Sequence, residues 1–180
     1  RFKTSALDMI APRKKLWSTP IEVIDVSIQL LQPGPGDIVF DMGCGDGRFL
    51  IRCAQLTGAK CVGVEIEESR AKEAQESVSR AGLDHLITIH VGNALDFDVS
   101  SATAFFLYLV PRGLRRILPI LRDLNKPLRV VTYMAGFEGI EPVAIEQVTP
   151  KHQPDAKWKV FLFYFGMSTP SWLHCVPCGL

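Results

Sequence analysis

Three glycines at alternate positions, Gly43, Gly45 and Gly47, constrain this chain more than any other feature of its sequence. They follow the apolar run 38–42, which is typical of a buried strand, and they precede an amphipathic segment that begins at Arg48. Glycine adopts positive φ easily and lets a backbone approach another molecule closely, and a turn that opens a helix offers free N–H groups. We therefore expect a strand–turn–helix unit that wraps a ligand.

The spacing of the glycines separates two classes of ligand. Counted from Gly43, the dinucleotide-binding fingerprint needs glycine at positions 43, 45 and 48, but position 48 is Arg48. Asp-x-Gly-x-Gly-x-Gly from Asp41 instead resembles the first motif of the class I S-adenosylmethionine (SAM)-dependent methyltransferases. Their ligand has an amino-acid end in place of a pyrophosphate. A nicotinamide oxidoreductase stays an alternative, which Arg48 disfavours.

A second motif strengthens the resemblance. The short apolar run Cys61–Glu65 ends in an acid and follows Asp41 at the distance of one βα unit. In a βαβ unit that acid lies at the carboxyl edge of the neighbouring strand, where it can accept hydrogen bonds from both hydroxyls of a ribose. We expect Glu65 to hold the ribose of SAM.

Asn93 follows a third apolar run, 86–91, at the sheet edge where an adenine would lie. Its amide can donate to and accept from an adenine edge, although asparagine after Gly92 is also a common turn former. The resemblance implies that SAM contacts residues at these strand ends and before the first helix: Trp17, Thr19, Asp41, Gly43, Cys44, Gly45, Asp46, Gly47, Glu65, Ile66, Asn93, Ala94 and Tyr108.

The first helix has three agreeing start signals. Thr19 is a candidate N-cap, Pro20 suits the first helical position, and Glu22 could complete a capping box. The helix should run to about Leu31, because Pro and Gly residues at 33–36 then break the chain.

Strand-like and helix-like segments alternate until the end of the chain, where two strands follow each other with only a proline-containing loop between them. That pair indicates an antiparallel hairpin. Strands are expected at 38–42, 61–65, 86–91, 103–110, 128–134, 143–148 and 158–165, and helices at 20–31, 48–57, 67–80 and 113–124. The resemblance implies an α/β, Rossmann-like fold with a mostly parallel seven-stranded sheet, helices on both faces, and the last strand inserted beside the fifth.

Size and composition limit the function classes. A chain of 180 residues suits one domain, and a net charge of +1 argues against a protein that grips DNA through its phosphates. No apolar run reaches membrane-spanning length, and five cysteines suit free thiols, so we expect an intracellular protein, cytoplasmic or mitochondrial. The C-x-x-C pair of Cys175 and Cys178 lacks two of the four ligands of a zinc site, so we expect no metal. We expect a flexible N-terminal arm (1–16), a SAM-binding domain (17–166) and a C-terminal tail (167–180).

The likeness is closest to one group of small methyltransferases. Trp17–Pro20, the two SAM motifs, Leu107–Pro111 and the closing hairpin resemble the lysine methyltransferases of the mitochondrial ATP synthase c subunit and of the adenine nucleotide translocase, with their bacterial relatives. This resemblance implies a protein lysine as methyl acceptor. A small molecule or RNA as acceptor, and a SAM-binding protein without turnover, stay open as alternatives.

Tyr108 is the best candidate for the acceptor pocket, where we assign it the catalytic role of a wall residue. It lies near the carboxyl end of an apolar run, and it alone in that run has a polar tip on an aromatic body. Core packing is its alternative role. The motif here, Tyr108–Pro111, replaces the Asn/Asp-Pro-Pro-Tyr/Phe of adenine and glutamine methyltransferases, which argues against base methylation. Weaker wall candidates are Trp17, Tyr133 and Phe137, and Glu138 and Asp46 could accept a proton, although neither is assigned as a general base.

Overall fold

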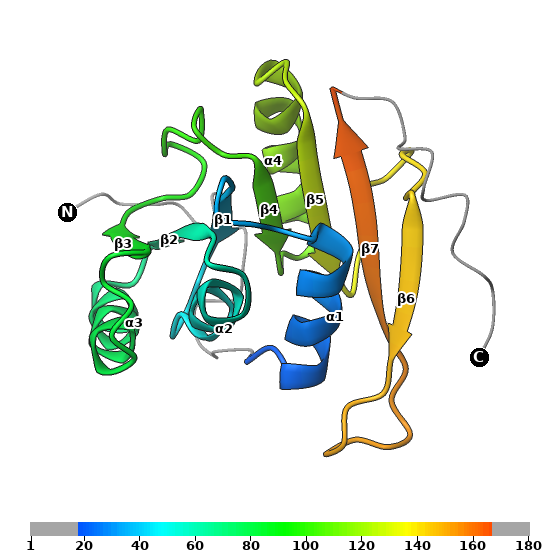
Figure 1. The fold of residues 1–180 in the computed structure, drawn as a ribbon. Helices are drawn as coiled ribbons and strands as arrows, with labels where there is room; N and C mark the ends of the chain where they lie inside the picture. The colour runs from blue at the N-terminus through cyan, green and yellow to red at the C-terminus, as the bar shows by residue number, and fades with distance from the viewer. Residues whose placement is uncertain (1–17, 167–180) are drawn as a thin grey trace.

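A seven-stranded sheet in the order β3-β2-β1-β4-β5-β7-β6 organises residues 18–166, the part of the chain that this computed structural model describes (Figure 1). The strands are β1 (Ile38–Met42), β2 (Lys60–Glu65), β3 (Ile87–Val91), β4 (Ala104–Leu107), β5 (Leu128–Tyr133), β6 (Ala144–Val148) and β7 (Trp158–Phe165). The helices are α1 (Ile21–Leu31), α2 (Arg48–Thr57), α3 (Glu68–Arg80) and α4 (Pro111–Asp123). The predicted fold class is confirmed.

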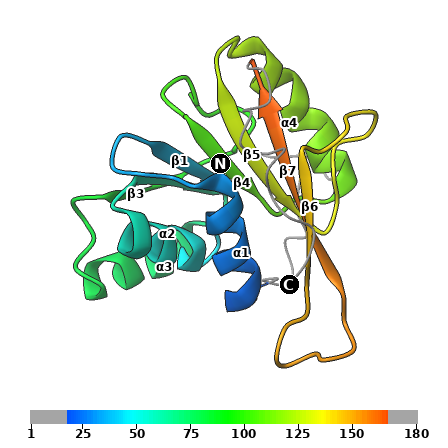
Figure 2. The same cartoon turned by 45° about the vertical axis from the view of Figure 1, so that its right-hand side comes forward.

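The closing hairpin has the predicted arrangement. Strand β7 lies between β5 and β6 and is antiparallel to both, whereas the pairs among β1 to β5 are parallel. Figure 2 shows the connection between β6 and β7 projecting beyond the helices. There Lys151 donates its backbone N–H to the Glu22 carboxylate of α1, over 3.2 Å.

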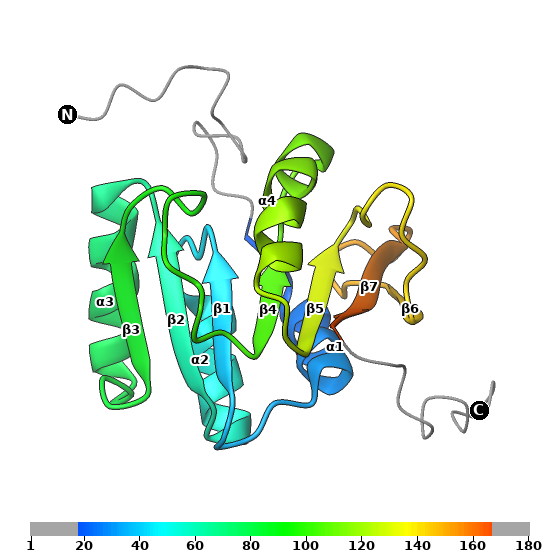
Figure 3. The same ribbon diagram turned by 90° about the horizontal axis from the view of Figure 1, so that it is seen from above.

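Helices cover both faces of the sheet. Seen from above, α1, α2 and α3 lie behind it and α4 lies in front (Figure 3). Each face has its own apolar cluster: Leu50 and Phe106 belong to the cluster under α1–α3, and Phe105 and Ile117 to the cluster under α4. Because β4 sends successive side chains to opposite faces, its apolar run is buried on both sides, as expected of a central parallel strand.

The predicted cap of α1 is wrong. The helix begins one residue later than expected, with Pro20 as the cap residue and no side-chain capping bond. Glu22 is therefore at the second helical position, where a capping box cannot form. Its carboxylate binds the β6–β7 connection instead, and Thr19 is buried.

The segment between β4 and α4 also differs from the prediction. Strand β4 ends at Leu107 and not at Val110, and α4 begins at Pro111 and not at Gly113. Proline fits the first helical position because its missing N–H has no partner there. Pro119 lies inside α4 without splitting it. Tyr108 therefore belongs to a connection just beyond the sheet, and the other predicted bounds agree within one residue.

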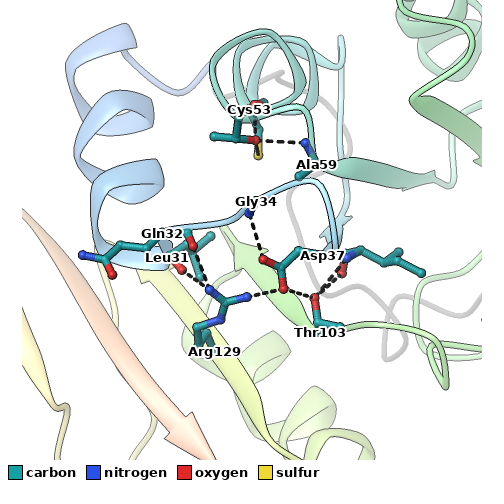
Figure 4. Close-up of polar contacts among 10 residues, drawn as sticks. Leu31, Gln32, Gly34, Asp37, Cys53, Ala59, Thr103 and Arg129 are labelled. Carbon is teal, nitrogen blue, oxygen red and sulfur yellow. Dashed lines mark hydrogen bonds and ion pairs between the residues drawn. The ribbon is translucent and has the colours of Figure 1, made fainter. Parts of the chain in front are cut away.

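Arg129 ties the amino edge of the sheet together (Figure 4). Its guanidinium donates to the carbonyl oxygens of Leu31 and Gln32, at 2.8 and 2.9 Å, and pairs with Asp37. The Asp37 carboxylate also accepts the Thr103 hydroxyl, at 2.7 Å. Burial would raise the pKa of Asp37, but the hydrogen bonds from Arg129 and Thr103 outweigh it and lower this pKa. One side chain thus joins α1, β1 and β5.

We expect Arg129→Met to lower the free energy of unfolding by about 2–3 kcal/mol, because it leaves the Asp37 carboxylate without its positively charged partner and the carbonyl oxygens of Leu31 and Gln32 without the guanidinium donor. Urea unfolding measures the change. Arg52→Met is the matched control, since it removes a bidentate pair with Asp25 that is far more exposed. Equal losses in the two variants would contradict this role for Arg129.

Candidate functional site

A cleft opens at the carboxyl edge of the sheet, between β1 and β4. In an open α/β sheet this is the point where the strand order reverses, and ligands bind there. Three segments line the cleft: the residues before α1, the turn between β1 and α2, and the end of β4. The lining residues are Ser18, Thr19, Asp41, Gly43, Cys44, Gly45, Asp46, Arg48, Phe49, Phe106 and Tyr108.

The glycine turn has the backbone that its sequence predicts. Gly43, Gly45 and Gly47 have φ of 103°, 55° and 77°. The N–H groups of Gly43 and Cys44 donate to the Val64 carbonyl oxygen at 2.8 and 3.2 Å, which fixes the turn to the end of β2. Gly47 caps α2, and a Cβ there would lie 3.3 Å from the Cβ of Ala74 on α3. The third glycine thus serves helix packing, and the first two shape the cleft.

The Glu65 carboxylate holds this turn through hydrogen bonds to backbone N–H groups. One carboxylate oxygen accepts the Gly45 N–H and the other accepts the Glu67 N–H, both at 3.0 Å. The side chain is buried and does not line the cleft. Each carboxylate oxygen can accept more than one hydrogen bond, so ribose binding by Glu65 is compatible with this geometry and stays a prediction.

Asp41 is a buried acid at the floor of the cleft. Burial raises its pKa well above the ordinary value, and the negative charges of Glu65 and Asp46 add to the effect. Burial and Asp41 likewise raise the pKa of the Cys44 thiol, which makes this cysteine a poor nucleophile. The site therefore favours a positively charged ligand, which would stabilise the Asp41 carboxylate.

We expect SAM binding to release a proton from Asp41. The free protein holds this proton up to the raised pKa, and the positive charges of SAM lower that pKa, so affinity should increase as the pH rises through it. Calorimetry in buffers of different ionisation enthalpy measures the release, and Asp41→Asn should abolish it. Proton uptake by the wild type would refute this assignment.

Arg48 is a site residue that the sequence analysis missed, because we treated it only as a departure from the dinucleotide fingerprint. Its Nε and one terminal nitrogen donate to the Asp46 carboxylate at 3.0 and 2.6 Å. Burial would raise the pKa of Asp46, but Arg48 outweighs it and lowers this pKa. Asp46 is therefore a weak proton acceptor, and Arg48 brings a positive charge to the cleft.

Aromatic residues form the β4 side of the cleft. The rings of Phe49 and Phe106, also missed from sequence, stack with centroids 4.1 Å apart. Tyr108 is half-buried, donates its hydroxyl to the Met134 sulfur at 3.3 Å, and packs on Tyr133 with centroids 4.6 Å apart. Tyr133 itself is fully buried. The structure thus places Tyr108 in the lining of the cleft, and its role as a wall of the acceptor pocket stays a prediction.

Several predicted residues lie away from the cleft. Tyr133 and Phe137 are core residues, so their expected role as pocket walls is wrong. Asn93 uses its amide within its own turn, donating to Asp96 and accepting the Leu95 N–H, and its adenine contact stays a prediction. Gly47, Glu65, Ile66 and Ala94 are also absent from the cleft lining, and Trp17 falls outside the described residues.

Residues 18–166 contain no candidate metal site and no candidate membrane-spanning helix. No group of three or more His, Cys, Asp or Glu side chains in this part of the chain could hold a metal ion. No helix in the same range is long and apolar enough to cross a membrane. The C-x-x-C pair at Cys175 and Cys178 lies beyond it.

Known proteins with similar sequences are methyltransferases. A family model described as the ANTKMT methyltransferase domain matches residues 41–144. A protein-lysine N-methyltransferase of Saccharolobus islandicus is 31% identical over 82% of this chain and 91% of its own length. A 23S rRNA (uracil(1939)-C(5))-methyltransferase of an Azoarcus species is 40% identical over 58% of this chain, but this match spans only 25% of that enzyme.

A solved structure agrees with these matches. An RNA methyltransferase from Salinibacter ruber, in complex with S-adenosyl-L-homocysteine, has a TM-score of 0.75 and 28% identity over 86% of this chain and 97% of its own. The region that the family model matches, 41–144, includes the glycine turn, Glu65 and Tyr108. The comparisons therefore favour SAM over a nicotinamide cofactor. The chain belongs to the ANTKMT methyltransferase domain family, and it is a SAM-dependent methyltransferase.

Proposed function

We propose that this methyltransferase transfers the methyl group of SAM to a lysine side chain of a protein. The observation that carries the proposal is the aromatic wall at the end of β4, where Tyr108 lines the cleft and the residues that follow it, 109–111, include no amide or acid to hold a planar base. The protein-lysine N-methyltransferase of Saccharolobus islandicus supports the same acceptor, because the match covers 91% of that enzyme. RNA is the second candidate, because the Salinibacter ruber enzyme is named an RNA methyltransferase.

Methyl transfer from a sulfonium is an in-line displacement, so alignment and exclusion of water contribute most of the catalysis. The glycine turn and Asp41 would bind the cofactor, and Phe106 and Tyr108 would exclude water from the side where the acceptor arrives. A lysine ammonium must lose a proton before it attacks. An apolar wall and the nearby positive charge of the sulfonium both favour the neutral amine.

Neither of the two carboxylates considered as proton acceptors, Asp46 and Glu138, has the surroundings of a dedicated general base. Asp46 is paired with Arg48, and Glu138 is 81% exposed and lies 3.7 Å from Arg115. We therefore expect the lysine to lose its proton to water as it enters the cleft. Transfer should then increase with pH up to the pKa of the bound lysine.

We expect Tyr108→Ala to lower methyl transfer about tenfold or more while changing SAM affinity much less, because the lost wall aligns the acceptor and does not retain the cofactor. Single-turnover transfer and SAM titration on the same preparation measure the two effects. Tyr164→Ala is the control. Tyr164 is also partly buried, but it lies at the opposite edge of the sheet, where it is the β7 residue level with Arg129 of β5. Wild-type turnover in Tyr108→Ala would contradict this prediction and show that Tyr108 only packs against the core.

The acceptor class is tested by offering purified substrates separately. Labelled SAM and the enzyme are incubated with a pool of lysine-containing peptides, with the same pool after acetylation of its lysines, and with total RNA. We expect label in the unmodified peptides alone. Label in RNA and not in peptides would overturn the proposal.

A further inference from the structure

Met134 has an unusual backbone conformation for its position. Among residues 18–166, the residues other than glycine with positive φ are Gln32, Asn125 and Met134, at 46°, 45° and 69°. Gln32 and Asn125 lie at the ends of α1 and α4, where left-handed residues are common. Met134 instead follows β5, and its long apolar side chain is 48% exposed. Residues other than glycine rarely adopt the left-handed conformation, and those that do cluster at functional sites.

The surrounding backbone fixes this conformation. The Met134 N–H donates to the Lys159 carbonyl oxygen of β7 at 2.9 Å, and the buried Thr132 hydroxyl closes the turn by donating to the Ala135 carbonyl oxygen at 2.6 Å. Neither bond uses the Met134 side chain, and glycine would supply the N–H of residue 134 and its positive φ without strain. The fold therefore does not require the Met134 side chain.

The side chain instead contacts Tyr108, which lines the cleft. Leu107 of β4 is level with Thr132 of β5, so Tyr108 and Met134 both extend just beyond the carboxyl edge of the sheet. The Met134 sulfur accepts the Tyr108 hydroxyl at 3.3 Å. The cofactor turn lies on the β1 side of Tyr108 and Met134 lies on its β5 side, which leaves the β5 side for the acceptor.

We propose that Met134 is a specificity-determining residue for the acceptor. Its thioether packs along the methylene stem of the lysine and holds the Tyr108 ring in place against the reacting amine. Methionine suits this role because it is flexible and polarisable and adapts to an unbranched chain. The inference rests on the proposed lysine acceptor and adds the residue that recognises its aliphatic part.

Three variants test the proposal by steady-state transfer to a lysine peptide. Met134→Gly relieves the positive φ and removes the side chain, so we expect KM for the peptide to rise about tenfold, the scale of a lost apolar contact, with unchanged SAM affinity and an undiminished Tm. Met134→Leu keeps the apolar contact and should stay close to the wild type in KM. Asn125→Gly relieves positive φ at the other end of β5 and should leave KM unchanged.

Two results would overturn the proposal. An unchanged KM in Met134→Gly would show that the side chain does not meet the acceptor, and a lowered Tm with lost SAM binding would show that its role is structural. If the proposed lysine acceptor is itself wrong, the wild type will methylate no lysine peptide, which distinguishes that failure from a wrong role for Met134.

Discussion

Gly45→Val is expected to lower SAM affinity more than about 100-fold while leaving a folded protein. Gly45 has φ of 55°, a conformation that a β-branched residue resists, and it lines the cleft directly. A valine would either shift the turn or fill the space of the ligand. Because the Gly45 N–H donates to the Glu65 carboxylate, a shifted turn would also break the bond that supports it.

Circular dichroism and SAM titration on the same preparation measure this effect. Gly36→Val is the control, since Gly36 does not have positive φ and a Cβ there would meet no atom within 4 Å. We expect the control to bind SAM as the wild type does. Full SAM affinity in Gly45→Val would mean that the turn does not touch the cofactor.

Glu65→Ala is expected to weaken SAM binding by about 1.5–3 kcal/mol, the usual scale for hydrogen bonds to a charged acceptor. The structure adds a second cost, because the change also leaves the N–H groups of Gly45 and Glu67 without their acceptor. The variant should therefore lose stability as well as affinity. Calorimetry measures the affinity and urea unfolding measures the stability.

Glu65→Gln separates the two effects. Glutamine keeps the volume and one acceptor oxygen, so it should retain most of the stability and lose part of the affinity. A loss of stability with unchanged SAM affinity in Glu65→Ala would show that Glu65 only supports the turn and that the ribose assignment is wrong.

The parts of the fold that local sequence determines were predictable. Alternating glycines after an apolar run identified the β1–α2 turn, and two strands without a helix between them identified the β6–β7 hairpin. These signals are contained in short segments, because glycine conformation and strand periodicity do not depend on distant residues.

The errors come from contacts between distant residues. Glu22 was predicted to cap its own helix, but its carboxylate binds Lys151, on the far hairpin connection. Arg129 joins Leu31 and Asp37, which precede it in the sequence by 98 and 92 residues. Tyr133 was a wall candidate by its position at the end of a strand, but the pairing of β5 with β7 places its ring against Trp158, in the core. No local pattern reveals such partners.

The site was predictable where a motif covers it and not elsewhere. Asp41, Gly43 and Gly45 were found because the glycine motif includes them. Arg48 and Phe106 also line the cleft, but an arginine after a turn and a phenylalanine in an apolar strand have ordinary structural roles in most sequences. Only the folded chain shows that both face the same space as Tyr108.

The proposed reaction of this cleft is the transfer of a methyl group from SAM to a protein lysine. The most direct test is tandem mass spectrometry of a whole-cell extract, split into protein, RNA and small-molecule fractions after incubation with SAM that carries a deuterated methyl group, using the wild type and Gly45→Val in parallel. We predict deuterated methyl groups on lysine side chains with the wild type and none with the variant. Deuterated methyl groups on no lysine, with label recovered in RNA or small molecules, would contradict the account.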